Sequence, residues 1–277
     1  MSYRCFDIEI TDKVAHIQLS RPDELNTMVP EFWNDLPIIA AELSDSGAVR
    51  AVVISSTGRH FSAGMDLSVF TSTNLMGDGE AGRRNAGFSQ LVRRLQDSFT
   101  ALEQTRMPVL AAVQGGCIGG AVDMVCAADM RYASEDAFFV VQETAIGMTA
   151  DVGTLQRLPK LIPDGVAREL IYTGRRMSAQ RAFEVGLVNQ VFPDHESLVA
   201  GTLAIAREIA GHSPLAIWGS KEALVYARDH SVTDSLHQIS LWQSGAFQPA
   251  DMMESFAAKG EKRAPDYPDL PATPTFG

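Results

Sequence analysis

Apolar and polar residues alternate along the N-terminal part of the chain. Residues 3–10 alternate as a half-buried β-strand does, and residues 14–19 repeat the pattern after a short polar turn. The two segments together predict a β-hairpin. Apolar positions then recur at helical spacing from Phe32 to Leu43, and the small or polar residues 44–47 end this predicted helix.

Two continuous apolar runs, 51–54 and 108–113, indicate strands that are covered on both faces. A polar, glycine-rich stretch and then a predicted helix over 88–102 separate them, and a helix of small residues over 120–128 follows. Two short strands are predicted next: 130–133 and 137–141. Because strands and helices alternate in short, uneven units, the pattern favours an α/β core coiled from ββα units over a regular barrel.

The strand pattern stops near His195. Three helices are predicted beyond it: 198–209, 215–226 and 232–247. They have no sheet of their own, so they must cover the core or another subunit. The chain is therefore divided into a core (1–195), a helical oligomerisation region (196–263) and a tail (264–277) that holds four prolines and is expected to lack fixed structure.

The composition is that of a soluble globular protein. The chain has 277 residues, of which 45% are hydrophobic and 21% are charged. Its 23 basic and 34 acidic residues give a formal net charge of −11. Because basic surface supplies most of the affinity in non-specific nucleic-acid binding, this charge disfavours a nucleic-acid partner.

Sequence signals for other compartments are missing from the pattern. The first residues lack the basic and apolar segments of a signal peptide, and no apolar run approaches the length of a membrane span. The last residues are not a peroxisomal address. With three cysteines that cannot all pair with one another, the sequence predicts a reduced, cytoplasmic protein without a membrane partner.

Residues 77–82 match the GxGxxG spacing of a dinucleotide-binding loop, but their context argues against that role. No strand is predicted before them, and Asp78 and Glu80 would repel a phosphate. The six histidines lack the spacing of a helical metal site, and no GxSxG motif is present. A metal enzyme and a serine hydrolase are therefore not predicted.

Two glycine-rich turns, 58–67 and 115–123, each follow a buried strand. Glycine and alanine let the backbone approach a ligand closely, and two such turns can direct two N–H groups at one point, as in an oxyanion hole. In the second turn the glycines begin a helix, whose positive end adds to the field. The alternative is a pair of tight turns that serve packing only.

Three acidic residues lie in apolar segments: Asp123, Glu143 and Asp151. A carboxyl group in apolar surroundings has a raised pKa and can exchange protons near neutral pH, so three of them around one pocket would form a proton shuttle. The alternatives are helix-capping roles for Asp123 or Asp151 and salt bridges to Arg131 or Arg157.

The segment FSAGMDL (61–67) followed by GGCIGGAVD (115–123) resembles the paired signature of the enoyl-CoA hydratase/isomerase (crotonase) superfamily. The similarity runs from about residue 6 to residue 256. Within it, residues 150–160, together with Asp123 and Glu143, resemble the Δ3,5-Δ2,4-dienoyl-CoA isomerases. The resemblance implies a crotonase-type spiral of ββα units with a C-terminal helical region, assembled as a trimer or as a hexamer built from two trimers.

The resemblance also implies roles for the residues of the two turns and for the acids. The N–H groups of Met65 and Gly120 would hold the thioester oxygen. Other residues would line the substrate site: Ala63, Gly64, Asp66 and Gly119. Asp151 would take a proton from C2, Glu143 would return one at C6, and Asp123 would tune or orient its neighbours.

The implied reaction is isomerisation of a 3,5-dienoyl-CoA to the 2,4-isomer in the breakdown of unsaturated fatty acids. It needs no metal or redox cofactor, and CoA is part of the substrate. The loop that often supplies a basic residue for CoA has Leu25 at that place, with Glu24 beside it. Three other basic residues are candidates for the CoA phosphates: Arg21, Arg59 and Lys221.

Other functions remain open for the same residues. A 2-enoyl-CoA hydratase would use Asp123 and Glu143 to handle a water molecule. A CoA-ester-binding or assembly protein without catalysis would not require all three acids. RNA binding, known for some relatives of the family, fits poorly with the net charge of −11.

Overall fold

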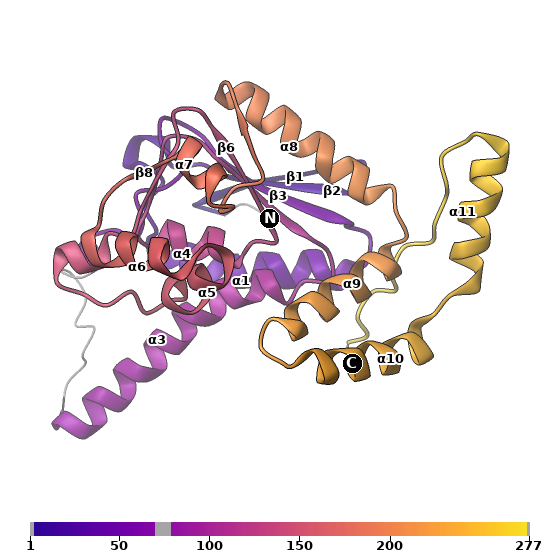
Figure 1. Cartoon of the computed structure of the whole chain (residues 1–277). Coiled ribbons are helices and arrows are strands. Elements are labelled where there is room, and N and C mark those ends of the chain that lie inside the picture. Colours follow the sequence, from indigo (N-terminus) through magenta and orange to yellow (C-terminus); the bar gives the residue numbers. More distant parts are fainter. Residues whose placement is uncertain (1–2, 70–78, 276–277) are drawn as a thin grey trace.

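The computed structural model describes residues 3–69 and 79–275, and within them the strands form two sheets (Figure 1). The larger sheet has the order β1 (Phe6–Thr11), β2 (Val14–Leu19), β3 (Ala51–Ser56), β4 (Val109–Val113), β6 (Met130–Ser134) and β9 (Gln190–Phe192). The smaller sheet has the order β5 (Gly116–Ile118), β7 (Phe138–Val140) and β8 (Met177–Ser178). β1 and β2 pair antiparallel, which confirms the predicted hairpin, whereas the other neighbours in the larger sheet are parallel.

Helices alternate with these strands, so the predicted α/β class is confirmed. Those of the first half are α1 (Pro30–Ser46), α3 (Ala81–Glu103) and α4 (Gly120–Ala127), with the 3-10 helix η1 (Pro22–Glu24). The short 3-10 helix η2 (Glu143–Ile146) precedes α5 (Thr154–Leu161), α6 (Asp164–Thr173) and α7 (Ala179–Glu184). Across residues 3–69 and 79–275, no helix combines the length and apolar character that crossing a bilayer requires.

β3 shows how the apolar runs are used. All six of its residues are buried. Val52 and Ile54 belong to the main core, which includes α1, whereas Ala51 and Val53 belong to a second apolar cluster on the other face of the sheet. Because side chains alternate between the faces of a strand, a continuous apolar run is what a strand covered on both faces requires.

α8 (His195–Ala210) covers that second face. Its residues Leu198, Ala206 and Ala210 lie in the same cluster as Ala51 and Val53. The helix therefore belongs to the core, and the predicted division at residue 195 separates it from the sheet that it covers. The physical reason is that the second face of the parallel sheet would otherwise be exposed to water.

The remaining helices form an arm that extends away from the sheets (Figure 1). It consists of α9 (Pro214–Ala227), α10 (Val232–Ala246) and α11 (Pro249–Glu261). The sequence pattern missed α11, which starts with Pro249 in its first turn and with Gln248 accepting a hydrogen bond from the N–H of Ala250. Proline in the first turn is a helix-start signal. The prediction that the last helix ends near Phe247 did not take this signal into account.

The proline-rich tail differs from the expectation that it lacks fixed structure. Asp269 pairs with Arg50 at 2.8 Å and with Lys13 at 2.7 Å, and Tyr267 is buried. Arg106 donates a hydrogen bond to the carbonyl of Pro271. Prolines restrict the backbone to extended conformations, so the tail loses little entropy when these contacts hold it against the core.

α3 begins earlier than the apolar spacing predicted. Glu80 is its N-cap and accepts hydrogen bonds from the N–H groups of Gly82 and Arg83. Part of the GxGxxG match is therefore a helix start, where an acidic cap is favoured. Gly77 and Asp78 of that match lie outside the described residues.

Candidate active site

Three segments of backbone run side by side at the ends of the central strands. The N–H of Met28 donates to the carbonyl of Gly64 at 2.8 Å. On the other side, Ser62 donates to the carbonyl of Gly116 and receives a hydrogen bond from the N–H of Ile118, both at 3.1 Å. The first glycine turn is thus held between two neighbouring segments.

Two buried polar side chains fix this turn, and the sequence analysis did not single them out. The hydroxyl of Ser62 donates to the carbonyl of Asn26 at 2.8 Å and accepts from the N–H of Gly64. The amide of Asn26 donates to the carbonyls of Thr57 and His60. The available signal was a small polar residue inside an otherwise apolar and glycine-rich turn.

Glycine is required where the two turns meet. Gly64 has φ of 83°, and a Cβ on it would lie 2.5 Å from the carbonyl oxygen of Ile118. Gly119 has φ of 54°, and a Cβ on it would lie 3.2 Å from Oε1 of Glu143. Only glycine fits both the left-handed backbone and the close approach.

The two predicted N–H donors lie close together. A Cβ built on Gly120 would lie 3.8 Å from the backbone nitrogen of Met65. Gly120 is the first residue of α4, where N–H groups have no acceptor within the helix. Neither the Met65 N–H nor the Gly120 N–H has an acceptor among the described residues. The pair is therefore available to a ligand oxygen.

The residues predicted to line the substrate site lie in these same turns. The N–H of Ala63 donates to the carbonyl of Leu25. Asp66 accepts hydrogen bonds from the hydroxyls of Thr27 and Ser68, which lower the pKa of its carboxyl group. Asp66 thus holds the turn in place, in addition to any contact with a ligand.

Asp123 is fully buried on α4. Its Oδ1 accepts a hydrogen bond from the N–H of Thr154 at 2.5 Å, and its Oδ2 has no partner within the described residues. Burial raises the pKa of Asp123 to about 6, and the charge of Asp151 adds to the effect while the Thr154 hydrogen bond opposes it. The helix-capping alternative thus holds for Oδ1 of Asp123, which accepts the N–H of the first residue of α5.

Glu143 is the first residue of η2, beside Gly119. In the described part of the chain its buried Oε2 has no hydrogen-bond partner. Burial raises the pKa of Glu143 to about 7, with further contributions from the charges of Asp123 and Asp151. A carboxyl group with this pKa exists in both protonation states near neutral pH.

Asp151 lies in the turn before α5 and is half-buried. Burial raises the pKa of its carboxyl group. The backbone carbonyl of Asp151 accepts a hydrogen bond from the side-chain amide of Gln96 at 2.7 Å, which ties the turn to α3. Because Asp151 acts electrostatically on both Asp123 and Glu143, the structure brings the three predicted acids together.

The predicted salt-bridge alternatives do not occur. In the described part of the chain, the guanidinium of Arg131 donates only to backbone carbonyls, among them that of Leu187. Arg157 pairs with Glu103, a residue that the sequence analysis did not name. The three acids are therefore controlled by burial and by one another more than by direct ion pairs.

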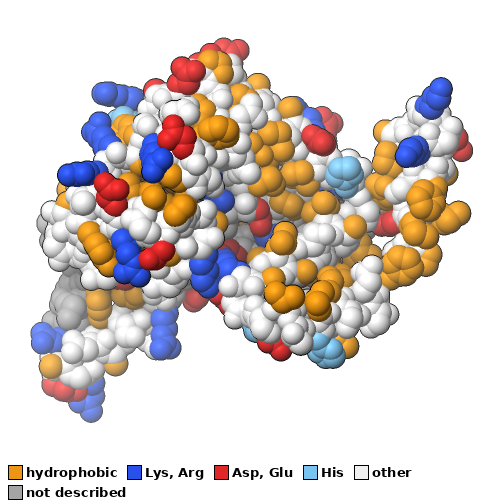
Figure 2. Space-filling view, in the orientation of Figure 1, with side chains coloured by type: hydrophobic (Ala, Val, Ile, Leu, Met, Phe, Trp, Pro, Cys, Tyr) orange, Lys and Arg blue, Asp and Glu red, His pale blue; other side chains and the backbone are white. Residues whose placement is uncertain are grey.

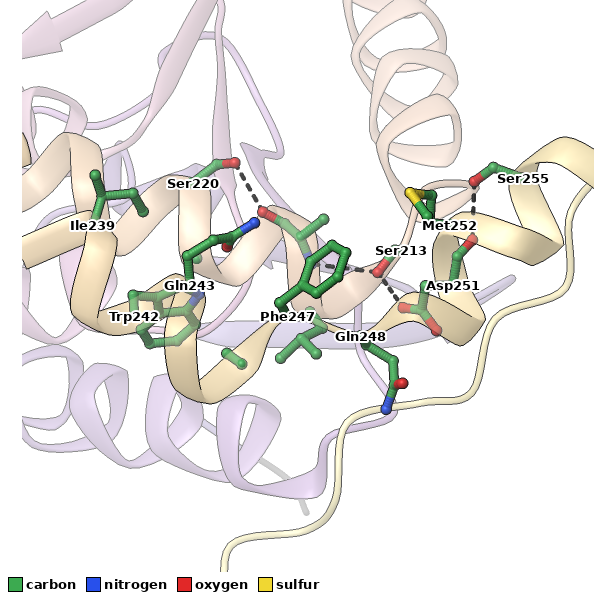
Figure 3. Close-up of a pocket in the computed structure, with 14 residues that line it drawn as sticks. Ser213, Ser220, Ile239, Trp242, Gln243, Phe247, Gln248, Asp251, Met252 and Ser255 are labelled. Carbon is green, nitrogen blue, oxygen red and sulfur yellow. Dashed lines mark hydrogen bonds between the residues drawn. The ribbon is translucent and has the colours of Figure 1, made fainter.

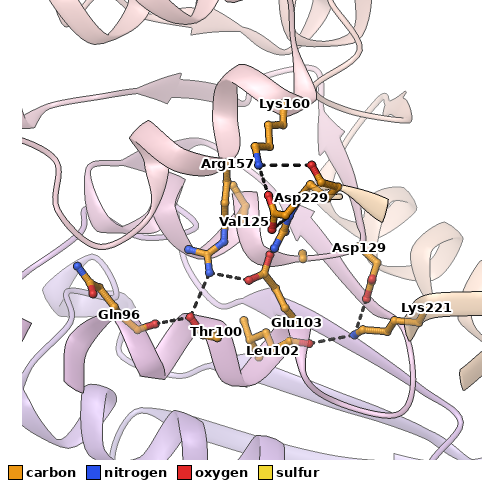
Figure 4. Close-up of polar contacts among 12 residues, drawn as sticks. Gln96, Thr100, Leu102, Glu103, Val125, Asp129, Arg157, Lys160, Lys221 and Asp229 are labelled. Carbon is orange, nitrogen blue, oxygen red and sulfur yellow. Dashed lines mark hydrogen bonds and ion pairs between the residues drawn. The ribbon is translucent and has the colours of Figure 1, made fainter. Parts of the chain in front are cut away.

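Two of the three basic candidates for the CoA phosphates are engaged elsewhere. Lys221 is buried, pairs with Asp129 at 2.8 Å and donates to the carbonyl of Leu102 (Figure 4). Arg21 donates to a backbone carbonyl in its own loop and is nearly buried. Arg59 is exposed and remains a candidate. Sequence alone could not separate them, because burial of a basic residue depends on distant segments.

Comparisons with known proteins identify the family to which the chain belongs. Residues 9–270 match the family model described as enoyl-CoA hydratase/isomerase. The mitochondrial Delta(3,5)-Delta(2,4)-dienoyl-CoA isomerase of Rattus norvegicus is 42% identical over 252 residues, covering 90% of this chain and 77% of the relative. The peroxisomal isomerase of that name from Arabidopsis thaliana is 37% identical, covering 97% of this chain and 99% of the relative.

A solved structure is also similar along nearly the whole chain. It is a putative enoyl-CoA hydratase from Streptomyces coelicolor A3(2), with a TM-score of 0.86, 29% identity and coverage of 96% of this chain and 95% of that one. The match confirms the predicted crotonase-type fold.

The expected cytoplasmic location is wrong. The similar isomerases are named mitochondrial or peroxisomal, which contradicts it. The cysteine content could not indicate the compartment, for a physical reason. Buried, unpaired thiols such as Cys117 and Cys126 persist in any reducing compartment and do not distinguish one from another.

The raised pKa of Asp123 predicts a specific pH dependence of stability. The folded protein binds the Asp123 proton more tightly than the unfolded chain does, so the contribution of Asp123 to stability falls as pH rises from about 4 to about 6 and stays lower above that. Asp123→Asn removes this cost, which is about 3 kcal/mol for a shift of roughly two pKa units. Relative to the wild type, the variant should therefore gain stability between pH 4 and pH 7.5.

Urea denaturation at the two pH values, with protein concentration held constant, measures this difference. Asp97→Asn at an exposed side chain of α3 is the control and should follow the wild type at both pH values. A wild-type minus Asp123→Asn difference that does not change with pH would contradict the burial of an acid with a raised pKa.

Proposed function

Because this chain belongs to the enoyl-CoA hydratase/isomerase family, we propose that it is an acyl-CoA isomerase that converts a 3,5-dienoyl-CoA into the 2,4-isomer. The observation that supports this substrate best is the third acid. Asp151 lies beside Asp123 and Glu143 in a largely apolar region, where two acids would suffice for adding water. Identity of 42% to a protein named for this reaction supports the same proposal.

The N–H groups of Met65 and Gly120 would stabilise the negative charge that develops on the thioester oxygen. Removal of a proton from C2 produces a dienolate, and two preorganised donors lower the barrier to forming it. The first turn of α4 adds its positive end to the same point. The unused donors and their proximity support this role.

Asp151 would remove the C2 proton, and Glu143 would deliver a proton to C6. The positions lie several bonds apart, so two separate carboxyl groups are reasonable. After one turnover Asp151 holds a proton and Glu143 has lost one, and exchange between them restores the starting state. Asp123, which is buried and acts electrostatically on Glu143, would tune this exchange. The reaction involves no net oxidation or reduction, and the two N–H donors would stabilise the charge of the dienolate, so we propose that it needs neither a redox cofactor nor a metal.

A 2-enoyl-CoA hydratase is the second candidate. The structural relative from Streptomyces coelicolor is named as a putative enzyme of that kind. Asp123 and Glu143 each have one buried oxygen without a partner among the described residues, and these two oxygens could hold a water molecule. A binding protein without catalysis is less well supported, because burial of three carboxyl groups lowers stability and binding alone does not require it.

The substrate assay separates these functions. Purified protein is mixed with 3,5-dienoyl-CoA or with 2-enoyl-CoA, and ultraviolet absorbance is followed. We expect rapid appearance of the conjugated 2,4-dienoyl chromophore with the first substrate. Loss of the 2-enoyl absorbance without activity on the dienoyl substrate would identify a hydratase instead.

The second test addresses the base. Asp151→Asn keeps the size of the side chain but cannot accept a proton, so kcat should fall by about 10²–10⁴-fold, the usual contribution of a general base. Circular dichroism and the melting temperature should stay near the wild-type values, because the side chain is half-buried and the Gln96 contact is to the backbone. Asp164→Asn is the matched control, and unchanged turnover in Asp151→Asn would refute the assignment.

We also propose that the chain assembles as a homotrimer or as a hexamer of two trimers through its helical arm. Many large apolar side chains of the arm are exposed (Figure 2): Leu224, Val232, Leu236, Leu241, Phe247, Met252, Met253 and Phe256. A groove of about 320 Å³ runs between α9, α10 and α11, with Trp242 and Phe247 on its walls (Figure 3). Exposed apolar surface of this extent is typical of a subunit contact.

A charge placed on this surface should weaken assembly. Leu236→Glu and Phe256→Glu, at side chains that are 64% and 62% exposed, should reduce the mass measured by sedimentation equilibrium at micromolar concentration. Tyr172→Glu on α6 changes a similarly exposed side chain outside the arm and should keep the wild-type mass. If all three variants keep that mass, the arm is not the contact.

A further inference from the structure

A buried ion pair lies behind the turn that carries Asp151 (Figure 4). Nη2 of Arg157 on α5 donates to Oε2 of Glu103 at 2.6 Å and to the hydroxyl of Thr100 at 3.2 Å. Only 12% of the Arg157 side chain and 8% of the Glu103 side chain are exposed. A pair with so little contact with water acts on neighbouring charges with little screening.

The guanidinium also contacts the turn itself. Its Nη1 lies 3.5 Å from the carbonyl oxygen of Val152, and a Cβ on Gly153 would come within 1.9 Å of the same nitrogen. The next residue, Thr154, donates its N–H to Asp123. A continuous series of contacts therefore connects Arg157 with the backbone on which Asp151 and the Asp123 hydrogen bond depend.

The charges around the acids are few. The charge of Asp151 raises the pKa of Asp123, Asp123 in turn acts on Glu143, and the positive charge of Arg157 lowers the pKa of Asp123 by less than burial raises it. Two buried thiols, Cys117 and Cys126, also face Asp123, and burial raises the pKa of both. Arg157 is thus a positive charge close to Asp123 that opposes the effect of burial.

The groups that face Arg157 balance that charge. Glu103 pairs with it through one oxygen and with Arg228, at the end of α9, through the other. Burial raises the pKa of Glu103, but the hydrogen bonds from the two arginines outweigh burial and lower it overall. Lys160 and Asp229 form a further pair at the rim, where a groove of about 330 Å³ admits solvent.

We propose that Arg157 is a positioning residue of the isomerase: it holds the Asp151 turn, and its charge, set against that of Glu103, acts on the neighbouring acids. The proposal rests on the function proposed above. The hydrogen-bond partners of the Arg157 guanidinium are Val152, Thr100 and Glu103, so we propose that it acts through the turn and through its field.

Opposite effects of the two partners distinguish this role from a structural one. Arg157→Gln removes a positive charge near the acids, so they should hold protons more tightly. Glu103→Gln removes a negative charge, so they should release protons more easily. Both variants break the same ion pair, and damage to packing alone would affect them in the same direction.

The experiment is the pH profile of kcat/KM with 3,5-dienoyl-CoA. The acidic limb reports the ionised base and the alkaline limb the protonated acid. In Arg157→Gln both limbs should move up by about 0.5–1 pH unit, and in Glu103→Gln both should move down by about the same amount. Arg157→Lys, which keeps the charge, should retain the wild-type limbs with a lower rate. Shifts in the same direction, or lower rates without shifts, would overturn the proposal.

Two further measurements cover other outcomes. If Arg157→Gln does not fold, Arg228→Gln at the partly exposed end of the network should move both limbs of the pH profile upward by a smaller amount. The absence of a shift in that variant would count against the proposal. Arg168→Gln breaks a surface ion pair on α6 and is the control. It should keep the wild-type profile.

Isotope-edited infrared titration of carboxyl groups, without substrate, gives a readout that does not depend on activity. The same opposite shifts are expected for the acids that titrate near pH 6 to 7 in the wild type. If the shifts occur but no dienoyl-CoA is isomerised, the proposed function fails while the control of the acids by Arg157 stands. If dienoyl-CoA is isomerised but the shifts are absent, the proposed function stands and the control of the acids by Arg157 is refuted.

Discussion

Burial of three carboxyl groups with little direct countercharge is the constraint on which the site depends. In water all three would be ionised at neutral pH, and none could donate a proton. Here burial raises the pKa of Asp123 to about 6 and that of Glu143 to about 7, and each charge makes the next one less favourable. The cost in stability is about 1.4 kcal/mol for each unit of pKa shift, and the apolar core on both faces of the sheet must offset it.

The acids have few partners, whereas the turns around them are held by polar groups whose hydrogen bonds are satisfied. Ser62 and Asn26 hold the first turn, and left-handed glycines allow the second turn to approach it. α4 connects the two parts of the site, since it begins with the N–H of Gly120 and carries Asp123 one turn later. One short helix thus positions a donor for an oxygen and a group that acts on the acids.

Local pattern predicted the parts of this structure that depend on neighbouring residues. The strand at Val14–Leu19, the hairpin and the two glycine turns follow from alternation and from glycine chemistry. The three acids could also be chosen, because each lies in an apolar segment. The roles of Lys221 and Arg157 could not, because their partners lie more than fifty residues away in the chain. The ordered tail was missed for the same reason, since Arg50 and Lys13 bind it from the other end of the sequence.

An isomerase that moves a proton from C2 to C6 needs one ionised and one protonated carboxyl group at the same pH. Equal burial would raise the pKa of every acid to a similar extent and would not make them different. The difference arises from unequal surroundings. Asp151 is half-buried, and burial is the principal influence that raises its pKa, whereas Glu143 is more deeply enclosed and also feels the charges of both other acids. These unequal surroundings support the proposed roles of Glu143 as the proton donor and Asp151 as the base. The proposed assignment of base and acid therefore depends on the degree of burial and on neighbouring charges, and a residue that alters the local field is expected to act on both groups together.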